Sequence, residues 1–185
     1  MTGNKFTYLP RALAHDFDWA HMHWSAQWLY VTIQQSRTQI IPSVFKWDTD
    51  LWRVQAQALT EDMILAAAEE LASAGFLMVD EASRECHLRR FLEFDNLVKY
   101  PNTLVGLAND LTKVGSWEIR SAVVTQLRAL RDVFPDLSGW SRTQVAEVMV
   151  ASYGVPEFAW INERSKGEMP FVLPDAEAEP VPETE

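Results

Sequence analysis

Residues 69–91, "EELASAGFLMVDEASRECHLRRF", change their hydrophobic period twice, and this stretch decides the fold. Its first residues continue a helical pattern that ends at Gly75, because glycine readily takes the left-handed conformation found after helices. Two strand-like segments follow, "FLMVD" and "CHLRRFLEF", joined by the polar turn "EASR". A helix followed by a short hairpin forms the second half of a winged helix-turn-helix, in which the hairpin is the wing.

The residues before this stretch supply the other elements of such a domain. Residues 18–36 predict an amphipathic helix, with apolar side chains at spacings of three and four: Trp24, Trp28, Leu29 and Ile33. Residues 38–45, "TQIIPSVF", predict an edge strand or an extended loop, because Pro42 has no N–H for a ladder. Residues 46–59 predict a short helix, with Leu51, Trp52 and Val54 as candidates for burial. Thr60 is a good cap for a helix from residue 61 to about 74, which buries Ile64, Ala67, Ala68 and Leu71.

A second helical block follows the hairpin. Helices are predicted over residues 100–115, with Pro101 near the start, over 117–134 and over 140–154. The middle helix is strongly amphipathic, and one face carries Ile119, Val123, Leu127, Leu130 and Phe134. Ser141 and Gln144 have the spacing of a capping box at the start of the last helix.

The expected fold is mainly α with a small β-hairpin, an α+β protein. Residues 1–18 form an N-terminal arm of irregular structure, residues 19–98 the winged helix-turn-helix domain, and residues 99–154 a C-terminal helical extension. Residues 155–185 are a tail, which is acidic, proline-rich and expected to be disordered from about residue 174.

The amino-acid composition limits the classes of function that are expected of this protein. The chain has 185 residues, of which 48% are hydrophobic and 23% charged, as in ordinary soluble globular proteins. Neither an apolar run of membrane-spanning length nor a secretory signal peptide is evident, so a cytoplasmic protein is expected. Cys86 is the single cysteine, which excludes a disulfide framework within the chain. The motifs of phosphate-cradling loops, nucleophile elbows and metal clusters are missing, so we expect neither an enzyme nor a cofactor or metal.

The charge is uneven along the chain. The net charge of −10 argues against a generic nucleic-acid binder. However, residues 84–131 hold 8 basic and 5 acidic side chains, whereas residues 146–185 hold 2 basic and 9 acidic ones. An acidic tail is most often a solvated end, and less often a decoy that competes with nucleic acid for the protein's own basic patch.

Three passages carry a resemblance to a known type of protein: "HWSAQWLY" (23–30), "LAAAEELASAGFLMVD" (65–80) and "FLEFDNLVKYPN" (91–102). Over residues 20–132 the chain resembles the small winged helix-turn-helix proteins of actinobacterial phages, which are similar to the N-terminal domains of DnaD-type replication proteins. The resemblance implies double-stranded DNA binding in a bacterial host cell, in replication initiation or transcriptional regulation. Its motifs are mainly core and capping positions, which specify a fold better than an activity.

The chain departs from this type in the helix that would read the major groove. The solvent side of residues 60–74 offers only acidic or neutral polar side chains: Glu61, Asp62, Glu69, Glu70 and Ser73. A recognition helix normally presents polar or basic side chains to the bases, and carboxylates without nearby cations are repelled by phosphates. We therefore do not expect this helix to read bases in the usual way.

Two groups of basic residues are candidates for DNA contacts. The wing and the residues after it carry Arg84, His87, Arg89, Arg90 and Lys99. In the alternative interpretation, Arg89 and Arg90 pair with nearby carboxylates, namely Glu85, Glu93 or Asp95. The 117–134 helix carries Arg120, Arg128 and Arg131 within an arc of about 80°. These three could track phosphates, or they could form a solvated flank whose stems cover the core, which we favour.

Aromatic and histidine side chains give the remaining candidates. Trp19, Trp24, Trp47 and Trp52 belong to more tryptophans than a small winged domain usually buries, so one or two are expected at an interface with another chain. His15, His21 and His23 lack partners at metal-binding spacing, so packing or surface roles are expected for them.

Two functions remain open. In the first, which we favour because residues 84–131 are locally basic, the protein binds duplex DNA through the wing arginines and the helix stripe. In the second, the winged fold is a protein-interaction module that docks on a host replication or transcription protein without binding DNA. A homodimer is compatible with either.

Overall fold

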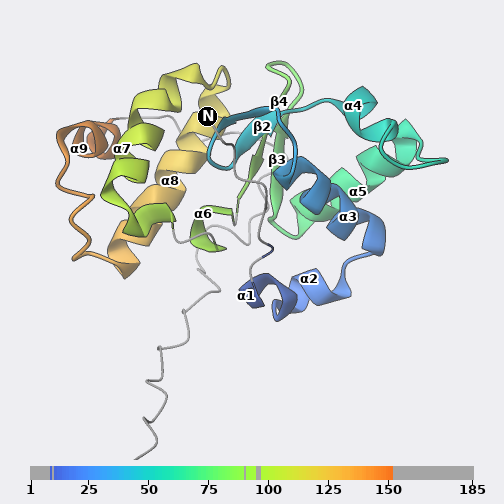
Figure 1. Cartoon of the computed structure of the whole chain (residues 1–185), viewed down its shortest axis with the longest axis horizontal. Helices are drawn as coiled ribbons and strands as arrows, with labels where there is room; N and C mark the ends of the chain where they lie inside the picture. Colours follow the sequence, from blue (N-terminus) through green and yellow to red (C-terminus); the bar gives the residue numbers. More distant parts are fainter. Residues whose placement is uncertain (1–8, 10, 90, 95–96, 152–185) are drawn as a thin grey trace, which may run out of the picture.

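The computed structural model describes residues 9, 11–89, 91–94 and 97–151 (Figure 1). The protein is a mainly helical α+β structure around a small antiparallel sheet. The sheet has four strands in the order β1-β2-β4-β3. Figure 1 shows this sheet between two groups of helices, α3 to α5 on one side and α7 to α9 on the other. The α+β class and the hairpin β3–β4 were predicted, and residues 38–45 were expected to form an edge strand or an extended loop.

The N-terminal segment contains more helix than predicted. Its helices are α1 (Arg11–Ala14), α2 (Phe17–His21) and α3 (Trp24–Gln34). The expected irregular arm is therefore wrong for residues 11–18, and the helix expected over 18–36 is broken after His21. The break arises because the His23 side chain caps α3 by accepting from the Ser25 N–H. Leu13 of α1 is fully buried in the core, which holds this segment against the domain.

The segment predicted as one edge strand forms a hairpin. Strand β1 (Gln39–Ile41) turns through Pro42 and Ser43 into β2 (Val44–Lys46), and β2 lies at the centre of the sheet beside β4. The turn is tight because Ile41 pairs with Val44. The prediction failed here because a two-residue turn containing proline can reverse the chain without a break in apolar character.

The helix, turn and first wing strand agree closely with the sequence. After α4 (Thr49–Arg53), helix α5 (Glu61–Ser73) begins at the Thr60 cap, whose side chain accepts from the Met63 N–H. Gly75 follows α5 with a φ of 76°, and β3 (Leu77–Asp80) comes next. The turn of residues 81–84 leads into β4 (Glu85–Leu88). The second wing strand is shorter than predicted, because residues 91–94 form α6 (Phe91–Phe94).

The C-terminal block contains η1 (Leu97–Lys99), α7 (Pro101–Asp110), η2 (Leu111–Lys113), α8 (Trp117–Val133) and α9 (Thr143–Val150). Pro101 opens α7 as predicted. The expected capping box at α9 is wrong, because the Ser141 hydroxyl donates to the Ser138 carbonyl and Arg142 occupies the cap position. The predicted end of this helix at Gly154 lies outside the described residues.

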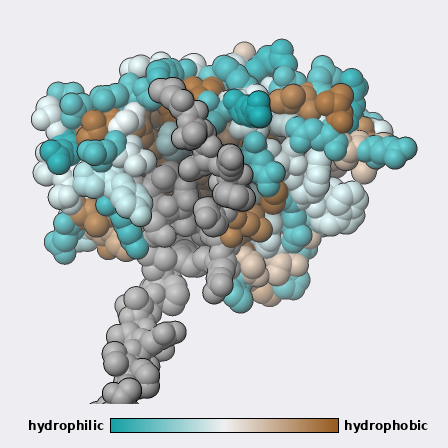
Figure 2. Space-filling model, viewed as in Figure 1, coloured by the Kyte–Doolittle hydropathy of each residue, from teal (hydrophilic) through white to brown (hydrophobic). Residues whose placement is uncertain are grey.

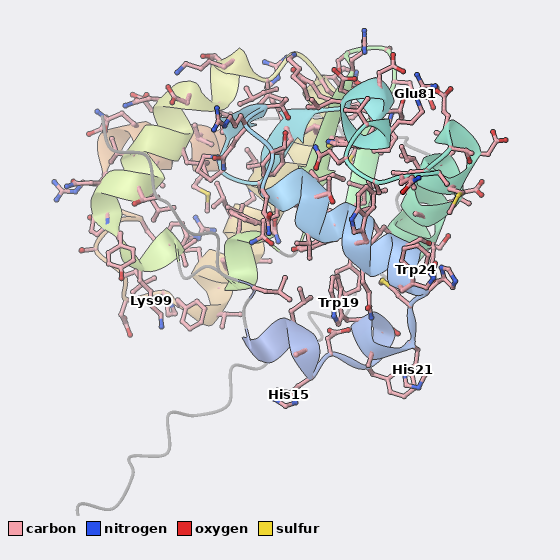
Figure 3. All side chains as sticks on the ribbon, turned by 45° about the vertical axis from the view of Figure 1, so that its right-hand side comes forward. His15, Trp19, His21, Trp24, Glu81 and Lys99 are labelled. Atoms are coloured by element: carbon pink, nitrogen blue, oxygen red, sulfur yellow. The ribbon has the colours of Figure 1, made fainter. Side chains whose placement is uncertain are left out.

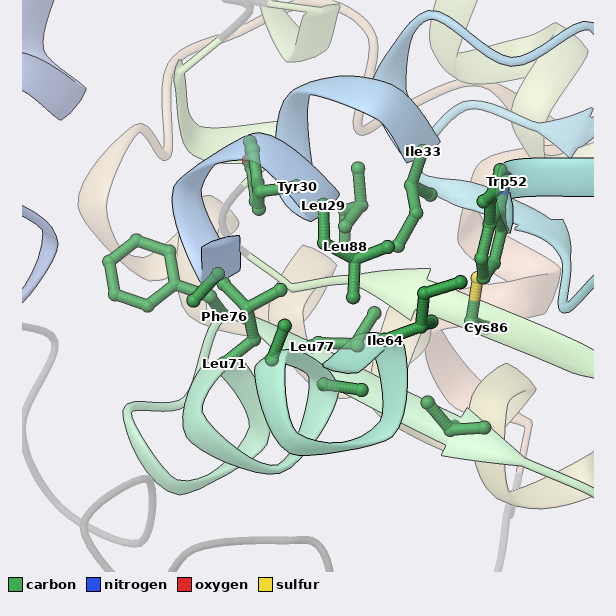
Figure 4. Packing of buried hydrophobic residues seen from close by; sticks show 14 of the residues in the cluster. Leu29, Tyr30, Ile33, Trp52, Ile64, Leu71, Phe76, Leu77, Cys86 and Leu88 are labelled. Atoms are coloured by element: carbon green, nitrogen blue, oxygen red, sulfur yellow. The ribbon is translucent and has the colours of Figure 1, made fainter. Parts of the chain in front are cut away.

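The sheet separates two hydrophobic clusters. On one face, Leu77, Val79, Cys86 and Leu88 pack with α3 and α5 (Figure 4). On the other face, Val44 and Met78 pack with side chains of α7, α8 and α9. This alternation follows from the two-residue period of a strand. Every residue of β3 and β4 is buried, so the hairpin expected to be a free wing is covered on both faces.

The Pro42–Ser43 turn gives a stability prediction. Ser43 has a φ of 76°, which the third position of a type II turn requires and which favours glycine. Its side chain is fully buried, and its hydroxyl finds no hydrogen-bond partner among the described residues. We expect Ser43→Gly to raise the free energy of unfolding by about 1 kcal/mol, because it removes both costs. Urea unfolding measures the change.

Ala66→Gly is the control for this substitution. Ala66 is exposed in the middle of α5, where glycine should cost about 1 kcal/mol. A loss of stability in Ser43→Gly would contradict the assignment of strain to the turn.

Candidate functional site

A row of charged side chains crosses the end of the sheet. Lys46, Glu85 and Asp80 occupy paired positions on β2, β4 and β3 and share one face. The Glu85 carboxylate is almost fully buried, and it accepts from the backbone N–H of Gly115 (3.0 Å) and of Ser116 (2.9 Å). It also accepts from Lys46 Nζ at 3.2 Å. These N–H groups lie at the start of α8, where the helix dipole favours a negative charge.

Asp80 completes the row and shapes the turn of the hairpin. Its Oδ1 accepts from the N–H groups of Ala82 (2.9 Å) and Ser83 (3.2 Å). Burial by itself would raise the pKa of Asp80, but the hydroxyls of Ser116 and Ser83 and these two N–H groups outweigh it and lower the pKa. Both carboxylates are thus engaged by internal donors. The row fastens α8 to the sheet.

His87 is not a surface residue. It is 1% exposed, and its Nδ1 lies 3.2 Å from the Ser43 carbonyl oxygen, to which it donates as the neutral ring. Burial, and to a smaller extent the positive charge of Arg89, lower the pKa of His87 to about 3. Hydrogen bonds with Ser43 and Gln126 act in the opposite direction and raise the pKa, but they are outweighed. The expected DNA contact through His87 is therefore corrected, because a buried neutral ring cannot reach a phosphate.

The cations of the wing have different environments. Arg84 is exposed in the hairpin turn with a φ of 54°. Arg89 is half-buried, and its carbonyl accepts from Gln126 of α8. Arg90 lies outside the described residues. Glu85 is held by Lys46 and by the start of α8. The side chains of the other alternative partners, Glu93 and Asp95, lie outside the described part, so the alternative pairing stays a prediction.

The arginines of α8 do not form a free basic row. Arg128 donates through Nε to the Met149 carbonyl (3.0 Å) and through Nη2 to the Ala151 carbonyl (2.7 Å). It therefore caps the end of α9, so both the phosphate contact and the favoured solvated flank are wrong for Arg128. Arg120 is half-buried, and within the described part its buried Nε has no hydrogen-bond partner. Arg131 is exposed, 3.9 Å from Asp132.

The remaining predicted cation lies far from the hairpin turn. Lys99 is exposed at the end of η1. In Figure 3 it lies at the opposite end of the molecule from Glu81, the first residue of the turn. Lys99 and the turn that carries Arg84 therefore do not share one patch.

The four tryptophans predicted at a partner interface divide into two kinds. Trp19 (7% exposed), Trp47 (7%) and Trp52 (0%) belong to the core on the α3–α5 side of the sheet, so their expected interface role is corrected. Trp47 and Trp52 pack edge to face at 4.8 Å. Trp24 is 60% exposed at the start of α3, where it remains available to a partner (Figure 3).

Helices α4 and α5 present an exposed surface that the sequence only partly revealed. The acidic side chains Glu61, Asp62 and Glu69 are exposed as predicted, whereas Glu70 is half-buried and accepts from the His23 N–H at 2.7 Å. Four exposed apolar side chains lie on the same two helices and just after α4: Leu51, Val54, Met63 and Leu65. Met63 and Leu65 fall off the buried face of α5, as the helical period indicates. The expected burial of Leu51 and Val54 is wrong, because only Trp52 of α4 enters the core.

His23 and Ser25 form a further pair of reactive side chains. His23 Nδ1 lies 2.7 Å from Ser25 Oγ, as a base does from a nucleophile, but Glu70 bonds the His23 backbone and does not orient its ring. The pair is an exposed helix cap. Within the described ranges, no three His, Cys, Asp or Glu side chains lie together as a metal site would require.

Comparisons of the chain with models of protein families, with curated proteins and with solved structures gave no match. The resemblance to phage winged-helix proteins thus stays a prediction from the sequence motifs. No helix of the described residues is long and apolar enough to cross a membrane.

Proposed function

We propose that this chain is a winged-helix protein-interaction module, which docks on a partner protein through α4 and α5 and does not read DNA. The order of α3, the β1–β2 hairpin, α4, α5, β3 and β4 supports the winged-helix assignment, as does the pairing of β2 with β4. In such a domain, α5 holds the position of the recognition helix.

One observation carries the proposal. Helix α5 exposes carboxylates and apolar side chains, and its residues include neither Lys nor Arg. A helix of this kind would be repelled by the phosphates on both sides of a DNA groove. The burial of both faces of β3 and β4 adds support, because a hairpin packed against α8 has no free face for a minor groove.

Duplex DNA is the competing function, and Arg84 in the exposed turn is the described cation best suited to it. The first test is fluorescence anisotropy of a labelled random duplex titrated with the full chain at low and at physiological salt. We expect no salt-sensitive binding. Salt-sensitive binding that Arg84→Ala weakens would overturn the proposal in favour of the DNA function.

The second test is comparative capture of partner proteins. Immobilised wild-type chain is compared with Glu69→Lys, which reverses a charge on α5, and with Asp132→Lys, a matched reversal of an exposed carboxylate on α8. We expect a protein that the wild type and Asp132→Lys retain and Glu69→Lys loses. Retention of the same proteins by all three would contradict docking through α5.

A further inference from the structure

Four apolar side chains are exposed on α4, directly after it and on α5, two helices that contact each other. Leu51 is 38% exposed and Val54 79%, in α4 and directly after it, and Met63 and Leu65 of α5 are each 38% exposed. A hydrogen bond from Thr49 Oγ1 to Glu61 Oε1 joins the starts of the two helices. Figure 2 shows hydrophobic surface over the end of the molecule that carries α4. Single exposed apolar residues are common, but a group on adjacent helices is typical of binding sites.

The charges around these side chains are almost all of one sign. Residues 48–73 contain six acidic residues, Asp48, Asp50, Glu61, Asp62, Glu69 and Glu70. Arg53 is the single Lys or Arg in that range, and it pairs with Asp50 at 2.9 Å. We call the exposed residues Leu51, Val54, Glu61, Asp62, Met63, Leu65 and Glu69 the acidic-apolar face. An occupant of this face must carry positive charge and apolar groups together.

The geometry of α5 restricts which kind of partner can bind to this face. Asp62 and Glu69 are seven residues apart, which sets them on the same side of the helix, two turns or about 10 Å apart along its axis. At the helical step of about 100° per residue, Leu65 lies about 50° from this line, whereas Met63 lies about 110° away on its other side. A partner helix with Lys or Arg at a seven-residue spacing can match both carboxylates, while its leucines cover Leu65.

We infer that the acidic-apolar face binds a basic amphipathic helix of a partner protein. This inference rests on the proposed function and specifies its partner. Helices commonly dock their apolar face onto a complementary surface, and the surrounding charges set the choice of partner. The carboxylates of α5 exclude acidic partners and nucleic acids and favour a lysine- or arginine-bearing helix.

The test uses three labelled synthetic peptides of 18 residues and the full chain. The first peptide is an amphipathic helix with leucine on one side and lysine on the other. The second replaces every lysine with glutamate, and the third replaces every leucine with serine. Anisotropy at about 0.15 M NaCl, where exposed charges are screened beyond roughly 8 Å, separates local recognition from attraction by the net charge. We expect the first peptide to bind at least about tenfold more tightly than either other peptide.

Two matched pairs of variants locate the site. Glu69→Lys on the face is paired with Asp132→Lys on α8, and Leu65→Ser with Val133→Ser, whose parent side chains are 38% and 43% exposed. We expect each face variant to weaken binding of the leucine–lysine peptide by about fivefold to tenfold. Each α8 variant should change it by less than about twofold. Circular dichroism verifies that all four variants keep the helical content of the wild type.

Three results would overturn the inference: no binding of the leucine–lysine peptide, equal binding of the serine peptide, or equal losses in the face and α8 variants. The capture experiment distinguishes these failures from failure of the proposed function. If a partner depends on Glu69 but the leucine–lysine peptide does not bind, the basic helix is wrong and the interaction module stands. If the duplex binds and no Glu69-dependent partner is found, both are wrong.

Discussion

Replacing Glu85 with alanine should lower the free energy of unfolding by about 3 kcal/mol. The Glu85 carboxylate accepts from the N–H groups of Gly115 and Ser116, and its removal leaves both at the start of α8 without this acceptor. Ser116 is buried, so water cannot readily replace the lost bond. The substitution also removes the charge that faces the α8 dipole and the partner of Lys46. Chemical denaturation at neutral pH measures the loss.

Glu81→Ala is the matched control, since Glu81 is an exposed carboxylate in the turn of the same hairpin. It should change stability by less than about 0.5 kcal/mol. Glu85→Gln should fall between the two, because an amide retains one acceptor oxygen in place of two. A loss below about 1 kcal/mol in Glu85→Ala would show that α8 is held on the sheet by its apolar face alone.

The second large effect is a fall in stability as the solution is acidified. Burial and the charge of Arg89 lower the pKa of His87 in the folded protein to about 3, whereas an unfolded histidine has its ordinary value of about 6.5. The unfolded chain therefore binds this proton first. The contribution of neutral His87 is complete above about pH 6.5 and is lost as the pH falls towards 3, by about 1.4 kcal/mol per pH unit.

The contribution of this group is the difference between wild type and His87→Gln in how far stability falls from pH 7.5 to pH 4.5. The pKa of Asp80 is lowered below its usual 3.8, so the contribution of that carboxylate is lost only at still lower pH. We expect His87 to account for about 2 to 3 kcal/mol of the loss between the two pH values. His87→Gln should be less stable than the wild type at pH 7.5. Its free energy of unfolding should fall less than that of the wild type on acidification.

His15→Gln is the control, because His15 is exposed. Its pH dependence should parallel that of the wild type. If the stability of His87→Gln fell on acidification as much as that of the wild type, protonation of His87 would have to occur without disturbing the contact between β4 and α8.

Local sequence was sufficient wherever a few neighbouring residues decide the structure. Helix α5, its Thr60 cap, Gly75 after it and the turn at residues 81–84 were all predicted, because caps and glycine conformations depend on contacts within one helical turn. The apolar face of α8 was also predicted, since Ile119, Val123, Leu127 and Leu130 repeat at the helical period and are buried. The acidic surface of α5 followed from the same period.

The tertiary structure alone decided what the side chains around the hairpin do. Glu85 and His87 alternate with apolar residues along β4, as residues on an exposed face would. Helix α8, some thirty residues further along the chain, covers that face. Arg128 resembled a solvent-facing cation until α9 brought two carbonyls within its reach. A two-residue period records that a strand has two faces, but it carries no information on whether a distant helix buries the second one. Whether the second face is buried depends on long-range packing. In this protein that packing covers the face that a free wing would leave exposed.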